Sequence, residues 1–177
     1  VPPGLERLPR VLVQTDAEPG SVDGTSMHIR LDFAGLLEQA VMHLAARGRS
    51  RLAVLARRSR RGEWFEQVAR TARHHGMVTR PYWIQQVSTV GMLGTEAARD
   101  VVHLLMHEGN EVRPDALYIA DENLVDPAAA GLLAAGIEMP GELDVVAFRH
   151  LPCGAPRVMP FARLGFHAGD VLGVAMD

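Results

Sequence analysis

The segment DFAGLLEQAVMHLAARGRSRLAVLA, residues 32–56, contains the two kinds of element that decide the fold. Its first half spaces apolar residues as they are spaced along one face of an amphipathic helix. These residues are Phe33, Leu36, Leu37, Ala40, Val41 and Leu44. Asp32 is suited to cap the start of that helix, and Gly48 is suited to end it. The unbroken apolar run over residues 52–56 predicts a strand that is buried on both faces.

The same alternation of helical segments and short apolar runs extends along the rest of the chain. Further strands are predicted at Val11–Gln14, Val78–Ile84, Ala116–Ala120, Leu143–Phe148 and Ala162–Phe166. Further helices are predicted at about Glu63–His75, at about Glu96–His107, and from close to Asp126 up to Gly136. The segment Ala17–Ser26 is rich in Gly, Ser and Asp and is predicted to be a loop or crossover. This order predicts the α/β class, a three-layer fold with helices on both faces of a parallel sheet.

Length and composition narrow the class of protein. The chain has 177 residues and a net charge of −3, so it lacks the basic excess of a free-standing nucleic-acid-binding protein. It contains no apolar run long enough to cross a membrane. Its single cysteine, Cys153, has no partner for an internal disulfide. We therefore predict a globular cytoplasmic protein of about one domain that does not associate with membranes.

Polar side chains follow the predicted strands. In open parallel sheets, ligands bind beyond the carboxyl ends of the strands, because the connecting loops and helix N-termini converge there. The residues at these positions are Arg57, Arg58, Ser59, Arg60, Arg61, Gln85, Gln86, Asp121, Glu122, Asn123, Arg149 and His150. Their mixed charges predict a small polar ligand held by charge-assisted hydrogen bonds. The alternative is structural, in which Asp121 or Glu122 caps a helix or pairs with Arg149.

Other chemistry finds little support in the sequence. His103 and His107 have helical i,i+4 spacing, but no third ligand or zincin motif accompanies them, so we predict no metal site. Cys153 lies in no nucleophile motif. No Walker loop or dinucleotide fingerprint follows any predicted strand. We therefore predict no cofactor, no catalytic residue and no enzymatic activity.

Several motifs together resemble the lactose/galactose-repressor (LacI/GalR) family of transcription regulators. One is Asp32 followed by Ala40, His43-Leu44 and Gly48, and then the strand RLAVLA at residues 51–56. The more specific pair is PDALYIADE at residues 114–122 and GIEMPGELDVVAF at residues 136–148. Pro160 and the RLGF segment at residues 163–166 resemble the family's crossover between subdomains. The resemblance therefore covers nearly the whole chain.

The resemblance implies a type I periplasmic-binding-protein-like fold, in which two α/β subdomains close on a small effector. Residues 32–160 would form the C-terminal effector-binding and dimerisation subdomain. Residues 1–31 would be a remnant of the N-terminal subdomain with the hinge crossover, and residues 161–177 would cross back toward it. Only one subdomain would be essentially complete, and operator DNA would be contacted only through an N-terminal headpiece that these residues do not include. The resemblance also implies a homodimer, with the fourth helix and the segments near Tyr82 and His150 as candidate self-contacts.

The family's effector contacts correspond to Trp64, Asp121 and Arg149 here, and all three differ from the usual residues. Trp64 replaces an arginine and Asp121 replaces an asparagine. Arg149 replaces an aspartate, which reverses the charge and favours an anionic or otherwise modified effector over an ordinary neutral sugar. The complete set of predicted ligand-binding residues is Asp121, Arg149, Trp64, Glu122, Arg60 and Gln85.

The function expected from this reasoning is allosteric sensing of a small effector by a DNA-binding transcription regulator. The effector would act by binding two conformational states with different affinity. The alternative is a solute-binding protein of a transport system, which shares the fold. The sequence upstream of Val1 separates the two, because a helix-turn-helix supports a regulator and a signal peptide supports a transport protein.

Overall fold

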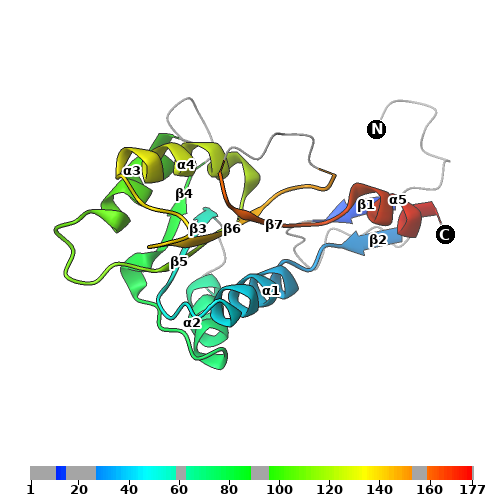
Figure 1. Ribbon diagram of the computed structural model, residues 1–177. Helices are drawn as coiled ribbons and strands as arrows, with labels where there is room; N and C mark the ends of the chain where they lie inside the picture. The colour runs from blue at the N-terminus through cyan, green and yellow to red at the C-terminus, as the bar shows by residue number, and fades with distance from the viewer. Residues whose placement is uncertain (1–10, 15–26, 59–62, 89–95, 153–158, 177) are drawn as a thin grey trace.

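The computed structural model describes residues 11–14, 27–58, 63–88, 96–152 and 159–176 (Figure 1). The strands are β1 (Val11–Gln14), β2 (Met27–Arg30), β3 (Leu52–Arg57), β4 (Ile84–Val87), β5 (Ala116–Ile119), β6 (Asp144–Phe148) and β7 (Ala162–Leu164). The α-helices are α1 (Phe33–Ala46), α2 (Trp64–His74), α3 (Glu96–Met106), α4 (Val125–Ala134) and α5 (Ala168–Met176). Two short 3₁₀ helices lie at Pro81–Trp83 and Glu122–Leu124.

The main sheet has five parallel strands in the order β4-β3-β5-β6-β7. The chain first moves outward from β3 to β4, and then returns to the other side of β3 to form β5. The winding direction therefore reverses between β3 and β5, which makes this boundary the topological switch point of the sheet. All the carboxyl ends of its strands lie along one edge.

Helices cover both faces of the sheet, which confirms the predicted three-layer α/β fold (Figure 1). Alternate residues along β3 enter different layers of the core, since strand side chains point to opposite faces in turn. Leu52 and Val54 pack with α1 and α2, whereas Ala53 and Leu55 pack with α3 and α4. All four side chains are fully buried. Double-sided burial explains why the run at residues 52–56 contains no polar residue.

The first predicted helix is confirmed with its predicted ends. Asp32 caps α1, because its Oδ1 accepts a hydrogen bond from the backbone N–H of Gly35 at 2.9 Å. Gly48 follows the helix with φ +80°, a conformation that side chains with a Cβ rarely adopt. The other predicted helices, α2, α3 and α4, are found within a residue or two of their expected bounds.

The third predicted strand, Val78–Ile84, is wrong. Val78 makes only an isolated bridge to Arg51, and residues 81–83 form a 3₁₀ helix. Proline explains the difference, because Pro81 has no N–H to donate to a strand ladder and its φ is fixed by the ring. Strand β4 begins only at Ile84. Gln85 and Gln86 therefore lie within the strand rather than after it.

Strands β1 and β2 form a separate two-stranded parallel sheet, and α5 lies beside β2 (Figure 1). The strand at Met27–Arg30 and the helix at Ala168–Met176 were not predicted. Strand β2 lacks an unbroken apolar run like that of β1, because His28 and Arg30 alternate with its apolar residues, and two glycines lower the helix propensity of α5. None of the helices in the described ranges is long and apolar enough to span a membrane.

Candidate functional site

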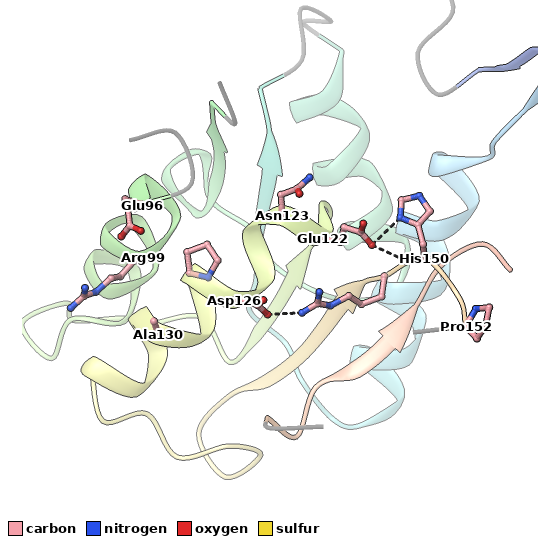
Figure 2. A pocket seen from close by; sticks show the side chains of 10 residues that line it. Glu96, Arg99, Glu122, Asn123, Asp126, Ala130, His150 and Pro152 are labelled. Carbon is pink, nitrogen blue, oxygen red and sulfur yellow. Dashed lines mark hydrogen bonds and ion pairs between the residues drawn. The ribbon is translucent and has the colours of Figure 1, made fainter. Parts of the chain in front are cut away.

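An open pocket of about 830 Å³ lies beyond the carboxyl ends of β5 and β6 (Figure 2). The side chains that line it come from the segments that follow these two strands and from the first turns of α3 and α4. They belong to Glu96, Arg99, Glu122, Asn123, Asp126, Pro127, Ala130, Arg149, His150 and Pro152. The pocket thus occupies the sheet edge at which the topology of parallel sheets places ligands.

The turn between β5 and α4 places Glu122 and Asn123 at the pocket, and Asp121 holds this turn in shape. Asp121 accepts hydrogen bonds on its Oδ1 from the backbone N–H and from the side-chain amide of Asn123, both at 2.9 Å. This cap starts the short 3₁₀ helix that leads into α4. Pro127 lies in the first turn of α4, where a missing N–H costs no helical hydrogen bond. The pocket therefore has the amino-terminal end of a helix on one side.

Glu122 and His150 join the two strand ends. The carboxylate Oε2 of Glu122 accepts a hydrogen bond from the backbone N–H of His150 at 3.0 Å and lies 2.8 Å from its imidazole Nδ1 (Figure 2). The backbone hydrogen bond is the largest cause that lowers the pKa of Glu122 below its ordinary value of 4.5. The His150 imidazole and the charge of Arg149 act in the same direction, while burial opposes them. Glu122 therefore presents a carboxylate to the pocket at neutral pH.

We predict that Glu122→Gln makes folding stability less sensitive to acid. Because the pKa of Glu122 is lowered in the folded state, its stabilising contribution is complete above its unfolded pKa and is lost as the pH falls through the lower folded value. The free energy of unfolding, measured by urea denaturation from about pH 6 to about pH 3, should fall less steeply in the variant than in the wild type.

His150→Ala is the matched comparison for that experiment. It removes the imidazole but keeps the backbone N–H, which is the largest cause of the lowered pKa. We expect it to keep most of the acid dependence that Glu122→Gln removes. Equal slopes for Glu122→Gln and the wild type would contradict the role given to this carboxylate.

Arg149 is paired across the pocket with Asp126. Its guanidinium donates a hydrogen bond to Oδ1 of Asp126 at 2.6 Å (Figure 2). The sequence analysis left open an ion pair between Arg149 and either Asp121 or Glu122. Arg149 does form an ion pair, but its partner is Asp126. Asp126 fills that role because the first turn of α4 places it opposite the end of β6, whereas the Glu122 carboxylate is hydrogen-bonded to His150.

Asp121 lies at the switch point rather than among the residues that line the pocket. Its Oδ2 is 3.5 Å from Nε of Arg57, the last residue of β3. This ion pair bridges the two strands between which the winding direction reverses. Asp121 thus combines a capping role, as the structural alternative expected, with an electrostatic contact beside the pocket.

Two of the other three predicted ligand residues, Gln85 and Trp64, do not line the pocket. Gln85 donates from Nε2 to the backbone oxygen of Tyr82 at 2.7 Å. Trp64 packs against the core between the sheet and helices α1 and α2, and its indole Nε1 is buried with no hydrogen-bond partner among the described residues. Arg60 lies outside the described residues, as does Cys153. Of the six predicted residues, Glu122 and Arg149 meet in the pocket.

Sequence reasoning missed several pocket residues, chiefly Glu96, Arg99 and Asp126. All three lie in the first two turns of predicted helices that start at the carboxyl edge of the sheet. Extending the search from the residues after each strand to the first turns of the following helices would have found them. His103 on α3 and His107, just after the end of that helix, are both exposed, with ring centroids 6.2 Å apart, and the described residues supply no third ligand for them.

Comparisons with known proteins identify what this arrangement is similar to. The family model described as "Periplasmic binding protein-like domain" matches residues 41–160. A curated relative, the lactose operon repressor of Rhizobium radiobacter, is 34% identical over 68 residues, which are 38% of this chain and 59% of the relative. The chain therefore spans less than two thirds of the length of that relative.

Solved structures share the fold. A LacI family transcription regulator from Clostridium acetobutylicum matches with a TM-score of 0.73 and 15% identity, over 96% of this chain and 60% of that chain. A putative ribose operon repressor from Burkholderia thailandensis matches with a TM-score of 0.60 and 20% identity, over 81% and 50%. A LacI family regulator from Lactobacillus casei, solved with bound glucose, matches with a TM-score of 0.65 and 17% identity, over 86% and 56%.

Proposed function

This chain belongs to the family of periplasmic binding protein-like domains, and from that premise we propose that it is the effector-sensing part of a LacI/GalR-type transcription regulator. The curated repressor, 34% identical over 68 residues, supports the resemblance to LacI/GalR regulators that the sequence predicted, and structures named as regulators of that family share the fold. These relatives are named as repressors and regulators, which agrees with the expectation that the chain is not an enzyme.

The observation that carries the proposal is the pocket at the carboxyl ends of β5 and β6. Glu122 offers a carboxylate, Arg149 a guanidinium and His150 an imidazole around one open volume. Such a set binds a small molecule that has hydroxyl groups and a negative charge, because hydroxyls donate to carboxylates and anions accept from guanidinium groups. The proposed effector is therefore a sugar-like or anionic polar molecule.

Arg149 is central to the choice between a neutral and an anionic effector. The Arg149 side chain is 20% exposed, whereas that of its present partner, Asp126, is 84% exposed, so the carboxylate side of this ion pair is open to solvent. An anionic ligand group is able to replace the Asp126 carboxylate at low cost and to take over the guanidinium.

The test of this function is binding of sugar-like compounds measured by calorimetry. Neutral glucose and anionic glucose 6-phosphate are suitable probes, and Arg149→Ala should weaken binding of the anionic probe by roughly tenfold or more, since charge-assisted hydrogen bonds are worth about 1.5–3 kcal/mol. Gln85→Ala is the control, because Gln85 bonds Tyr82 away from the pocket. Equal losses in the two variants, or binding unaffected by Arg149→Ala, would contradict the proposed site.

Sensing in this proposal works by a shift between two states. The effector would favour the closed arrangement of two subdomains, and a homodimer would pass that change to DNA-binding headpieces that contact operator DNA. In this scheme residues 1–31 and 161–177 belong to the N-terminal subdomain and its crossovers, and residues 32–160 form the C-terminal subdomain. The separate β1–β2 sheet with α5 beside it supports this division.

Dimerisation is proposed to involve α4, Tyr82 and His150. Tyr82 is 52% exposed and Leu133 on α4 is 61% exposed, which leaves apolar surface for a partner on both segments. Sedimentation of the 177-residue chain at increasing concentration tests this proposal. A monomeric mass at every concentration would contradict it, and Tyr82→Ser should weaken a dimer that uses this surface.

A second candidate function is that of a solute-binding protein of a transport system, since the family model that matches this chain is named after periplasmic binding proteins. The same pocket would serve either function. The coding sequence upstream of Val1 separates them, because a helix-turn-helix supports the regulator and a secretion signal supports the transport protein.

A further inference from the structure

Three potential metal ligands meet where helices α1 and α2 pack on the same face of the sheet. Glu38 lies on α1, His74 is the last residue of α2, and His75 caps the end of that helix. One ligand atom from each side chain lies within 4.8 Å of the other two. Among the described residues this is the group of histidine, cysteine and acidic side chains that is placed to share an ion. It lies on the opposite side of the sheet from α3 and α4, away from the pocket.

The existing contacts within this group bring the ligand atoms together. Nε2 of His75 and Oε1 of Glu38 are 2.5 Å apart, and the His74 and His75 rings contact edge to face with centroids 5.1 Å apart. The His75 side chain is 19% exposed and that of Glu38 is 46% exposed. An ion can therefore reach these three side chains from solvent. His75 is the less exposed of the two side chains in the hydrogen bond.

The chemistry of the group fits a transition-metal ion. Two imidazoles and one carboxylate suit zinc and its neighbours, whereas Mg²⁺ and Ca²⁺ prefer oxygen ligands. Tetrahedral zinc with bonds of about 2.1 Å would hold its ligand atoms about 3.4 Å apart. The Glu38–His75 pair, 2.5 Å apart, would have to open, and Glu38 has a side chain that is 46% exposed and so has room to rotate. The His74 ligand atom lies within 4.8 Å of the other two. The carbonyl end of α2 also favours a bound cation.

We propose that Glu38, His74 and His75 form a binding site for a zinc-class divalent transition-metal ion, which would link α1 to α2. A solvent molecule would complete the coordination, since three protein ligands leave an open position. An ion that binds only the folded chain raises its thermal stability. The site would thus couple the packing of two helices to the availability of the metal.

The experiment is calorimetric titration of the 177-residue chain with Zn²⁺, with thermal unfolding as a second readout. We expect one ion bound per chain and a rise in Tm. His74→Ala and Glu38→Gln should each weaken Zn²⁺ binding by roughly tenfold or more. His74→Ala leaves the Glu38–His75 hydrogen bond in place, so it separates a metal site from a simple contact between helices. Its Tm without metal shows whether the variant folds.

His103→Ala is the matched control, because His103 at the end of α3 also has a second histidine ring, that of His107, close to it, with ring centroids 6.2 Å apart. We expect it to leave Zn²⁺ binding unchanged, and we expect Mg²⁺ to give no comparable binding signal. Absence of Zn²⁺ binding at about 100 μM would overturn the proposal. Loss of the site in His103→Ala, with normal binding in His74→Ala, would overturn it as well.

Discussion

Gly165→Ala is expected to lower the free energy of unfolding by about 3 kcal/mol and to disrupt the pocket at the same time. Gly165 follows β7, directly beside the chain that leaves β6. A Cβ added to Gly165 would lie 1.8 Å from the backbone oxygen of Arg149, where no side-chain rotation relieves the clash. The two backbone segments must separate, although hydrogen bonds from Arg149 to Leu164 and from Leu151 to Phe166 hold them together.

The measurement is urea or thermal denaturation together with ligand titration. For a chain of this size the predicted loss corresponds to a drop of roughly 10 °C in Tm. Because the residue displaced is Arg149 itself, binding of the anionic probe should fall along with stability. A structural change remote from the pocket would lower stability without this effect on affinity.

Gly173→Ala provides the control for a glycine without steric contact. Nothing lies within 4 Å of the position that its Cβ would occupy, and it is inside helix α5. Alanine in a helix interior is better than glycine by about 0.5–1 kcal/mol, so this variant should be as stable as the wild type or slightly more so. Similar destabilisation in both variants would refute the steric argument.

Asp115→Ala is expected to cost about 3 kcal/mol of stability. Asp115 is only 8% exposed and precedes β5, where it receives hydrogen bonds from the segment that enters β3. Its Oδ1 accepts from the backbone N–H groups of Ser50 and Arg51 at 3.1 and 2.7 Å. Its Oδ2 lies 3.2 Å from the guanidinium of Arg51. Alanine would leave two donors unpaired at the junction of the two central strands.

Two further variants test that argument. Asp115→Asn keeps an acceptor oxygen but removes the charge, so its loss of stability should be clearly smaller. Asp170→Ala removes a carboxylate whose side chain is 87% exposed, and it should change stability by about 0.5 kcal/mol or less. If Asp115→Ala unfolds at the same urea concentration as Asp170→Ala, the hydrogen bonds to the buried Asp115 carboxylate do not stabilise the fold as argued.

Much of the fold could be predicted from the sequence, because strands and helices bury their apolar residues in different, regular patterns. The central strands contain apolar runs that are buried on both faces, at residues 52–56 in β3, over all of β5, and at residues 145–148 in β6. Helix α1 shows the opposite pattern, with buried Leu37, Val41 and Leu44 separated by exposed positions. Where burial is incomplete the signal fails, as at the edge strand β4, which begins six residues later than predicted because Pro81 interrupts the run.

The site was less predictable than the fold, since contacts between side chains depend on how helices approach the sheet edge. Glu122 and Arg149 were predicted from their places after two neighbouring strands, and both line the pocket. Asp126, the partner of Arg149, was not predicted, because it comes from the first turn of α4 rather than from a strand end. Trp64 has the spacing of a core residue as well as a ligand position, and the structure packs it against the core.

The two edges of the main sheet carry different kinds of polar residue. At the amino edge, Asp144 accepts hydrogen bonds from Arg47 and Arg49 at 2.9 and 2.7 Å, and it is only 7% exposed. At the carboxyl edge, Asp126 and His150 are largely exposed. Substitution of the exposed Asp126 or His150 should therefore change the polar groups beside the pocket at little cost in stability. Substitution of Asp144 would leave two arginines without their carboxylate, and backbone contacts such as that of Gly165 limit change at the carboxyl edge as well.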